Sequence, residues 1–368
     1  MTTLNHLDFL LCLIRLGIRT SRDVNIPPDV DWHQIKELAD AQGLSAIVLD
    51  GIDVLQSSSN AMLHECNREL PLQMKLEWIG EMLHDYEARY VEYEKAIASL
   101  AGWYNQHGFK MMVLKGYTCS MNWPKPEHRP CGDIDIWLFG KQKKADALIN
   151  KEKGIKVDTS EHHHTVLYWQ DFMVENHYDF INVHHHRSHQ EIEPFFKELG
   201  KDDTHFIEIG GQRVYLPSPN LHALFLLKHA SLHFASSELT MRQVLDWAFF
   251  VEKQGSRVDW EWLDRMLDAF GLRDFFNYIN AVCVDNLGFS PTLFPYSQFD
   301  PSLKKRILSD ILSPEFSGKE PKHWLPRVLF KYRRWKANEW KHKLCYKESM
   351  WSAFWSGVCS HMLKPSSI

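Results

Sequence analysis

The chain has 368 residues, of which 44% are hydrophobic and 13% aromatic, and its formal net charge is −5 with histidine neutral. This aromatic content excludes a disordered chain, and the length suffices for about two or three domains. The best candidate for a membrane span, residues 7–18, is interrupted by Arg15 and is shorter than the roughly 18 residues required. The N-terminus lacks the pattern of a signal peptide, so we expect a cytoplasmic protein. The seven cysteines include no CxxC pair, which predicts neither a disulfide framework nor a cysteine zinc site.

The first part of the sequence predicts helices. Apolar residues recur at three- and four-residue spacing from Leu4 to Ile18, and a second helix is expected from about Pro27 to a stop at Gly43. A polar turn at 56–60 then precedes a long periodic stretch over 61–104. We assign residues 1–105 to an N-terminal helical region.

The pattern changes at Gly108. Short apolar or alternating runs predict strands, with hairpin turns at Gln170-Asp171 and Gly210-Gly211. The expected strands cover 109–114, 134–139, 155–157, 165–169, 172–177, 207–209 and 213–216. We assign residues 106–217 to an α/β core.

The helical period returns after Ser218, with amphipathic helices expected over 221–233, 241–253 and 260–270. Residues 218–368 form a C-terminal helical region, and the predicted fold class is α+β, a mixed sheet between two helical regions. The last 48 residues, 321–368, hold ten basic and two acidic residues, with Trp interleaved over 323–343. We expect this Trp face to pack on the protein; the functional alternatives are contact with nucleic acid, an anionic membrane surface or an anionic-substrate cleft.

Two aspartates in the α/β core carry the functional argument. Asp133 and Asp135 are two residues apart on an expected strand, so they would project together while Ile134 and Ile136 enter the core. Two carboxylates this close repel unless a cation neutralises them, and oxygen ligands favour a hard cation such as Mg²⁺. Gly116, after a buried strand and before a short expected helix at 117–122, permits close approach to phosphate; otherwise it is an ordinary tight turn.

A third carboxylate is expected on the strand over 172–177. There Glu175 shares a face with Met173 and His177, so it could complete a triad with the two aspartates, and Asp179 is the rival candidate. His177 would orient Glu175, touch phosphate or be solvated.

At this point the residues resemble a known family. The runs V-L-K-G at 113–116 and P-E-H-R-P-C-G-D-I-D-I at 126–136 resemble the core motif of the polymerase-β-like nucleotidyltransferase superfamily. They are most similar to a bacterial branch of largely uncharacterised nucleotidyltransferases with an L-K-G turn, an Arg, a D-x-D strand and a later V-E-x-H strand. The R-x-x-x-D pattern at 242–246 resembles the helical region of the same branch.

The resemblance implies a nucleotidyltransferase-type sheet core and transfer of a nucleoside monophosphate from a triphosphate, ATP as first choice, to a hydroxyl of an unknown acceptor. Asp133 and Asp135 would hold Mg²⁺ or Mn²⁺, and Glu175 would bind a second ion and draw the hydroxyl proton. The phosphate contacts would come from Lys115, Gly116, Arg129, His177 and Arg242. Because Tyr117 follows Gly116 where many members have Ser or Gly, Thr118 or Ser120 would supply the hydroxyl contact.

Each assignment has a simpler alternative. Lys115 would be solvated, Arg129 would pair with an acid, and Arg242 is most simply an intrahelical partner of Asp246. For the whole chain, the alternatives are a non-catalytic nucleotide-binding or partner-binding module and a glycosyltransferase that holds a nucleotide-sugar through Mn²⁺. Nucleic acid is a less favoured partner, and the oligomeric state is open.

The 21 histidines include two triplets, 162–164 and 184–186. Because consecutive residues on a strand point to opposite faces, we expect that neither triplet chelates one ion. His229 and His233, four apart without an H-E-x-x-H motif, are expected to pack between helices.

Overall fold

The structure is a computed structural model that describes residues 6–21, 26–27, 29–57, 69–184, 186–202, 204–295, 299–316, 318, 320–353 and 355. Three helices form its N-terminal part: α1 (His6–Gly17), α2 (Trp32–Gln42) and α3 (Ser45–Ser57). The helix expected to stop at Gly43 is confirmed, since Gly43 caps α2 in the left-handed conformation, with φ 65°. Leu4, part of the expected polar turn and residues 61–68 of the periodic stretch lie outside the described residues.

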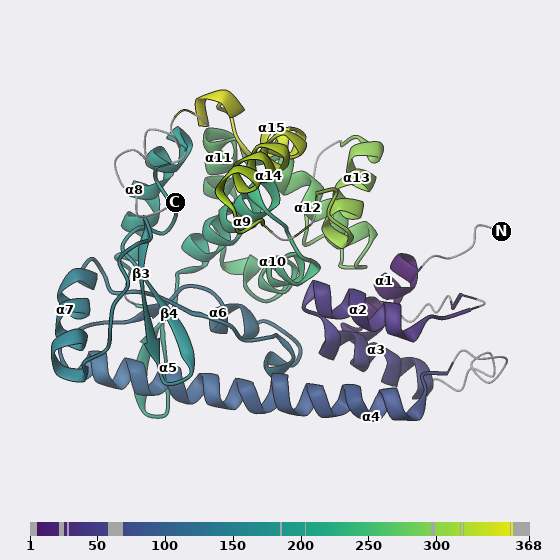
Figure 1. Cartoon of the computed structure of the whole chain (residues 1–368), viewed down its shortest axis with the longest axis horizontal. Helices are drawn as coiled ribbons and strands as arrows, with labels where there is room; N and C mark the ends of the chain where they lie inside the picture. The colour runs from purple at the N-terminus through teal and green to yellow at the C-terminus, as the bar shows by residue number, and fades with distance from the viewer. Residues whose placement is uncertain are drawn as a thin grey trace.

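The remaining periodic stretch forms one long helical rod. It comprises α4 (Leu72–Glu81), the π-helical segment η2 (Met82–Ala88) and α5 (Arg89–Gln106), which follow one another without a break. Figure 1 shows this rod running along the molecule, beneath the N-terminal helices at one end and beneath the sheet at the other.

The α/β core contains one six-stranded mixed sheet in the order β3-β4-β2-β1-β6-β5. Its strands are β1 (Met112–Val113), β2 (Ile134–Trp137), β3 (His164–Trp169), β4 (Phe172–His177), β5 (Phe206–Ile209) and β6 (Gln212–Tyr215). Both expected hairpins are confirmed, as antiparallel β3/β4 and β5/β6 pairs. The strand expected over 155–157 is wrong: only the next residue, Asp158, makes an isolated bridge to β3.

The two faces of the sheet pack against different helices. Ile134 and Ile136 of β2 are fully buried in a cluster with α5 and α7 (Gln142–Lys153). Trp137 of the same strand joins a second cluster with α8 (Arg187–Gly200) and α9 (Pro219–Ser236). Because side chains alternate along a strand, Asp135 lies on the face that α9 covers.

The short segments near the sheet and the C-terminal helices complete the fold. They are α6 (Tyr117–Ser120), η3 (Pro126–His128), α10 (Met241–Gln254), η4 (Gly255–Arg257), α11 (Trp260–Phe270), α12 (Arg273–Asp285) and α13 (Pro301–Leu312). The helix expected over 221–233 forms as α9, but its expected amphipathic pattern is wrong. Most of α9 is buried, including the side chain of Lys228 at 0% exposure, because α8, α10, α11 and α15 pack around it.

The basic, Trp-rich tail forms α14 (Trp324–Ala337) and α15 (Glu339–Cys345). The expectation that its Trp face packs on the protein holds only in part. Trp340 of α15 packs edge-on against Phe234 of α9, with ring centroids 5.6 Å apart. In α14, however, no residue is buried, and Trp324 is 72% exposed. Among the described residues, no helix is both long and apolar enough to cross a membrane.

Candidate active site

A cavity of about 190 Å³ lies where β1 ends and β2 begins, against α9 and α10. Residues of the expected turn and of the D-x-D strand line one part of the cavity, and residues of α9 and α10 line the other. The residues that line it are Lys115, Gly116, Cys119, Arg129, Gly132, Asp133, Asp135, Phe225, Leu226, His229, Ala230, His233, Arg242, Gln243 and Asp246.

Asp133 and Asp135 both line this cavity but differ in their surroundings. Asp135 is 1% exposed, and its Oδ1 lies 3.1 Å from Nζ of Lys115 and 3.1 Å from Nε2 of His177. Asp133 comes directly before β2 and is half-buried, and its backbone carbonyl accepts a 2.8 Å hydrogen bond from the hydroxyl of Tyr93. Burial lowers the pKa of Lys115, but the charges of Asp135, Asp133 and Glu175 outweigh it and raise that pKa.

Glu175 does not line the cavity but adjoins Asp135. The two residues are partners in the parallel β2/β4 pair, and Nε2 of His177 lies 3.5 Å from Oε2 of Glu175. Burial acts to raise the pKa of Glu175, but the hydrogen bond with His177 and the charge of Lys115 hold it at about 2. Burial acts to lower the pKa of His177, which its bonds to Asp135 and Glu175 raise to about 9. His177 therefore links the two carboxylates as a cation.

The rival candidate, Asp179, lies outside this group. Its carboxylate accepts a hydrogen bond from Lys197 of α8, and its backbone carbonyl lies 3.2 Å from Nδ1 of His177. Both nitrogens of the His177 ring therefore face acceptor oxygens, which suits the protonated imidazole.

Gly116 adopts a backbone conformation that other residues rarely adopt, with φ 72° and ψ −95°. A Cβ at this position would lie 2.6 Å from the hydroxyl of Tyr93, so only glycine fits this turn without displacement. The hydroxyls of Thr118 and Ser120 turn into the protein and bond to the carbonyls of Leu114 and Tyr117, at 3.1 and 2.7 Å. Neither residue lines the cavity.

Arg129 and Arg242 take different places in the cavity wall. The Arg129 guanidinium forms two hydrogen bonds with Asp246, from Nε at 2.7 Å and from Nη2 at 2.8 Å. The expected pair between Arg242 and Asp246 is therefore wrong, because Asp246 is already held by Arg129. Within the described part of the chain, Arg242 forms no hydrogen bond or ion pair, and its side chain passes Gly43 and reaches the cavity.

His229 and His233 line the same cavity, whereas their spacing predicted only packing between helices. Nε2 of His229 lies 3.2 Å from Nζ of Lys115, so this nitrogen accepts a hydrogen bond from the ammonium group. Burial and the charge of Lys115 lower the pKa of His229 well below its usual value and that of His233 to about 4. Their four-residue spacing on a helix beside the D-x-D strand was the available signal.

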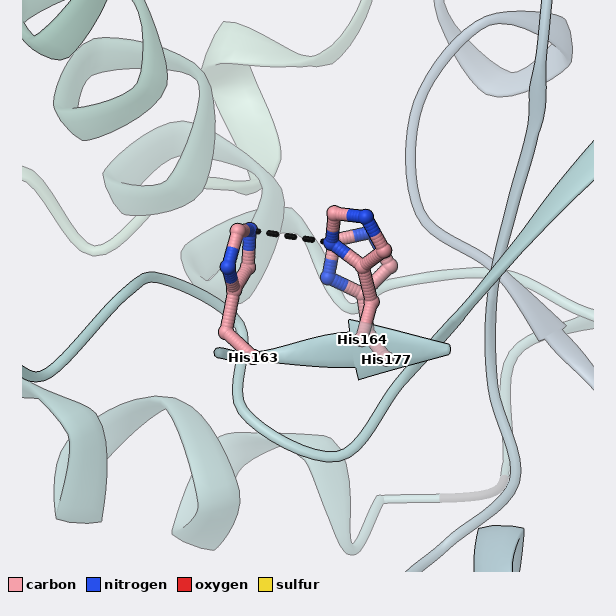
Figure 2. A group of neighbouring side chains, drawn as sticks. All are labelled: His163, His164 and His177. Atoms are coloured by element: carbon pink, nitrogen blue, oxygen red, sulfur yellow. Dashed lines mark hydrogen bonds between the residues drawn. The ribbon is translucent and has the colours of Figure 1, made fainter. Parts of the chain in front are cut away.

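The first histidine triplet does not lie on one strand, contrary to our expectation. His163 precedes β3 rather than lying on it, so the alternation of a strand does not separate it from His164. Nε2 of His163 lies 3.1 Å from Nδ1 of His164, and His164 is the register partner of His177. Figure 2 shows the three rings gathered at the end of the hairpin, and one nitrogen of each lies within 4.8 Å of the others.

The second triplet forms no such cluster in the residues described. His184 is exposed, His186 pairs with Glu348 at 3.2 Å, and His185 lies outside the described residues.

The donor set beside the cavity suits a divalent cation. One ligand atom each from Asp135, Glu175 and His177 lies within 4.8 Å of the other two. Carboxylate oxygens are the ligands that Mg²⁺ and Mn²⁺ take in phosphate-handling sites, and two of these three residues are carboxylates. Asp133 faces the same cavity from the adjacent turn.

Comparison with known proteins places the chain in a family. It belongs to the family of uncharacterised nucleotidyltransferases, which matches residues 28–288. This match covers the helices from α2, the whole sheet and the helices up to α12, so it includes the cavity and every residue of the D-x-D and V-E-x-H strands. Comparisons with curated proteins and with solved structures gave no match. The chain is therefore an enzyme of the nucleotidyltransferase class with an α+β fold.

Proposed function

We propose that the chain transfers a nucleoside monophosphate from a nucleoside triphosphate to a hydroxyl of an acceptor, with the cavity beside β2 as its active site. One observation carries the proposal: Asp133 and Asp135 line the same cavity as Lys115 and Arg242. Carboxylates that can hold a divalent cation thus face cationic side chains that can contact phosphate, which is the combination that phosphoryl transfer requires.

Asp133, Asp135 and Glu175 would hold Mg²⁺ or Mn²⁺. A cation bound there would neutralise phosphate charge and favour attack by the hydroxyl. The pairing of β2 with β4 fixes Asp135 beside Glu175, so the positions of these carboxylates are set by the backbone of the sheet. His177 orients both through its Nε2, and Glu175 would draw the proton from the acceptor hydroxyl.

The cationic side chains would contact the triphosphate. Lys115 reaches the cavity directly after β1, and Arg242 reaches it from α10 without a partner among the described residues. A free guanidinium presents a planar set of donors that can grip two phosphate oxygens. Gly116 lets the backbone approach the phosphates closely. Arg129, Thr118 and Ser120 are engaged inside the protein, so we assign them to holding the turn and α10 in place.

The test is nucleotide transfer by the purified chain. We expect pyrophosphate release and a labelled product when the protein is incubated with Mg²⁺ or Mn²⁺, each labelled nucleoside triphosphate and a cell extract. The Asp135→Asn variant should lose activity by on the order of 100-fold or more, since a carboxylate ligand is removed. Asp171→Asn, which makes the same change in charge at an exposed hairpin turn, is the matched control.

The other outcomes separate the remaining functions. Activity that survives in Asp135→Asn contradicts the proposal. Nucleotide binding without turnover in any extract would favour a non-catalytic nucleotide-binding module, and transfer of a sugar label would favour a glycosyltransferase.

A further inference from the structure

We propose that His163, His164 and His177 form a nitrogen-lined site for a divalent transition cation such as Zn²⁺, directly beside the carboxylates of the active site. Nitrogen atoms from all three rings lie within 4.8 Å of one another. The fold brings them together in two ways: His163 and His164 are adjacent at the start of β3, and His164 is paired with His177 across the β3/β4 hairpin (Figure 2).

The distances suit a transition cation. Nε2 of His163 and Nδ1 of His164 are 3.1 Å apart. Two nitrogens at about 2.0–2.1 Å from a tetrahedral Zn²⁺ stand at a comparable separation. Imidazole ligands favour Zn²⁺ and its neighbours in the first transition row, whereas Mg²⁺ takes oxygen ligands. The rings therefore select a different class of cation from the aspartates.

The surroundings of the rings support ligation. Oε1 of Glu175 lies 3.8 Å from Nε2 of His164, on the side of the ring away from His163. The backbone carbonyl of Asp179 lies 3.2 Å from Nδ1 of His177. A hydrogen-bonded carbonyl behind an imidazole is a usual partner that orients a metal-binding histidine, and the Asp179 carbonyl takes this place for His177, whereas Glu175 lies beyond hydrogen-bond distance of His164. In addition, Nδ1 of His163 is buried and has no hydrogen-bond partner among the described residues, so the protein does not satisfy both nitrogens of this ring.

His177 connects the imidazole site to the carboxylates of the active site. This residue belongs both to the imidazole set and to the set formed with Asp135 and Glu175. A cation bound to the His177 ring would compete with the contacts that its Nε2 makes with Asp135 and Glu175, at 3.1 and 3.5 Å. Occupancy of the imidazole site would therefore change the carboxylates' affinity for a second cation. The existence of the site does not depend on nucleotidyl transfer, since it is defined without a nucleotide.

The experiment is a titration of the metal-free full chain with Co²⁺, without nucleotide, followed by its visible absorption, with Zn²⁺ as competitor. We expect saturable d–d bands, which the His163→Ala/His164→Ala variant should lose, since it removes two of the three proposed ligands. His184→Ala, which removes an exposed histidine nearby, should bind as the unmodified chain does. His163→Gln, which keeps a polar side chain, should show the same direction of change if the double variant folds poorly.

Two results would overturn this proposal: equal Co²⁺ affinity with and without His163 and His164, or binding that is lost only in Asp133→Asn. The latter variant should lose nucleotidyl transfer while it keeps Co²⁺ binding, so failure of the imidazole site and failure of the proposed function give different results.

An independent observation concerns α14, and from it we infer that this helix binds an anionic lipid surface. Its exposed apolar side chains recur at four-residue spacing and therefore share one face. They are Trp324, Leu325, Val328, Leu329 and Tyr332, which are 72%, 60%, 58%, 50% and 48% exposed. Phe330, on the other side of the helix, packs against Phe316 with ring centroids 5.1 Å apart, so α14 turns its apolar face away from this contact.

Charge identifies the occupant of this face. The helix carries five basic residues, Arg327, Lys331, Arg333, Arg334 and Lys336, and no acidic one. A helix with an apolar face of Trp and Leu beside cationic side chains is the pattern that lies in the interface of an anionic bilayer. Nucleic acid would require aromatic rings for stacking, whereas much of this face is aliphatic.

The test is sedimentation of the full chain with vesicles. We expect binding to phosphatidylserine-containing vesicles and little binding to phosphatidylcholine vesicles. Leu325→Asp/Leu329→Asp should reduce binding by about tenfold or more, since it places charge in the apolar face. Leu72→Asp, at a 72% exposed position of α4, should not. Equal binding by the α14 variant, or binding to single-stranded nucleic acid but not to vesicles, would contradict the inference.

Discussion

Asp246 of α10 pairs with Arg129, which lies 117 residues earlier in the chain, and not with Arg242 one turn before it. Both carboxylate oxygens accept a hydrogen bond from the Arg129 guanidinium, and the indole of Trp123 donates a further one at 2.9 Å. This arrangement fastens the segment before β2 to α10 and leaves Arg242 to face the cavity.

Breaking the Arg129–Asp246 ion pair and removing Arg242 should therefore have different effects. Asp246→Ala leaves the buried guanidinium of Arg129 without a counter-charge, and we expect it to lower the free energy of unfolding by about 3–5 kcal/mol. Arg242→Ala should cost about 1 kcal/mol or less but weaken nucleoside triphosphate binding by roughly 10- to 100-fold. Urea unfolding and a nucleotide titration measure the two effects. Equal losses of stability would contradict this division.

The turn at Gly116 offers a second test. Gly108 and Gly116 have nearly equal φ angles, 73° and 72°, but a Cβ at Gly108 would meet no atom within 4 Å. Gly108→Ala should cost about 1 kcal/mol from backbone strain alone. Gly116→Ala should cost about 2–3 kcal/mol, because its ψ of −95° lies outside the left-handed region and the new methyl also displaces the Tyr93 hydroxyl from the Asp133 carbonyl.

Thermal unfolding of the two alanine variants compares these costs directly. Adding Tyr93→Phe to Gly116→Ala removes the clash but not the strain, so the combined loss should be smaller than the sum of the two single losses. Additive losses would show that the hydroxyl of Tyr93 does not oppose the methyl group.

The parts of the fold that the sequence predicted depend on local chemistry. The two hairpins follow from alternating apolar residues around turns at Gln170 and Gly210, and the burial of Ile134 and Ile136 follows from the two-residue period of a strand. The strand expected over 155–157 did not form. A short apolar run becomes a strand only where the fold places another strand beside it. Likewise, the exposure of Trp324 depends on what surrounds α14, which its own sequence does not specify.

The site shows the same limit. The spacing of Asp133 and Asp135 was enough to predict that they project together, and both line the same cavity. His229 meets Lys115 across 114 residues of sequence, and only the packing of α9 on the sheet creates this contact. The pairing of Asp246 with Arg129 also depends on tertiary packing. The four-residue spacing between Arg242 and Asp246 had favoured a local pair instead.

Lys341 and Lys343 of α15 provide a matched pair for the basic tail. The ammonium group of Lys341 lies 2.6 Å from Asp310, and both side chains are 1% exposed, whereas Lys343 is 71% exposed beside Glu339. Lys341→Met leaves a buried carboxylate unpaired and should cost about 3–5 kcal/mol, while Lys343→Met should change stability by less than about 0.5 kcal/mol. Urea unfolding of both variants checks this, and equal effects would show that the buried pair contributes no more than a surface pair.

Glu193 of α8 should make stability depend on pH. Its side chain is 4% exposed and accepts hydrogen bonds from the backbone N–H groups of Phe180 and Ile181, at 2.9 and 3.3 Å. Burial raises the pKa of Glu193 from 4.5 to about 8, although the bond from Phe180 acts to lower it. Between these two values the folded chain holds a proton that the unfolded chain has released, so the stabilising contribution is complete below the lower value and is lost as the pH rises to the upper one.

Glu193→Gln removes this titration, since the amide stays neutral at every pH. Phe180 bonds to Oε1 and Ile181 to Oε2, so the single carbonyl oxygen of Gln accepts only one of the two N–H groups, and this loss does not vary with pH. Each unit of pKa shift corresponds to about 1.4 kcal/mol, so the stability of Glu193→Gln relative to the unmodified chain should rise by a few kcal/mol between pH of about 5 and about 9. Taking the difference between the two proteins cancels the titration of all other groups. Urea unfolding across this range measures it, with Glu198→Gln, at a 73% exposed position of the same helix, as the control that should stay parallel to the unmodified chain. A parallel curve for Glu193→Gln would mean that Glu193 is ionised in the folded protein, held by Lys197 at 3.7 Å.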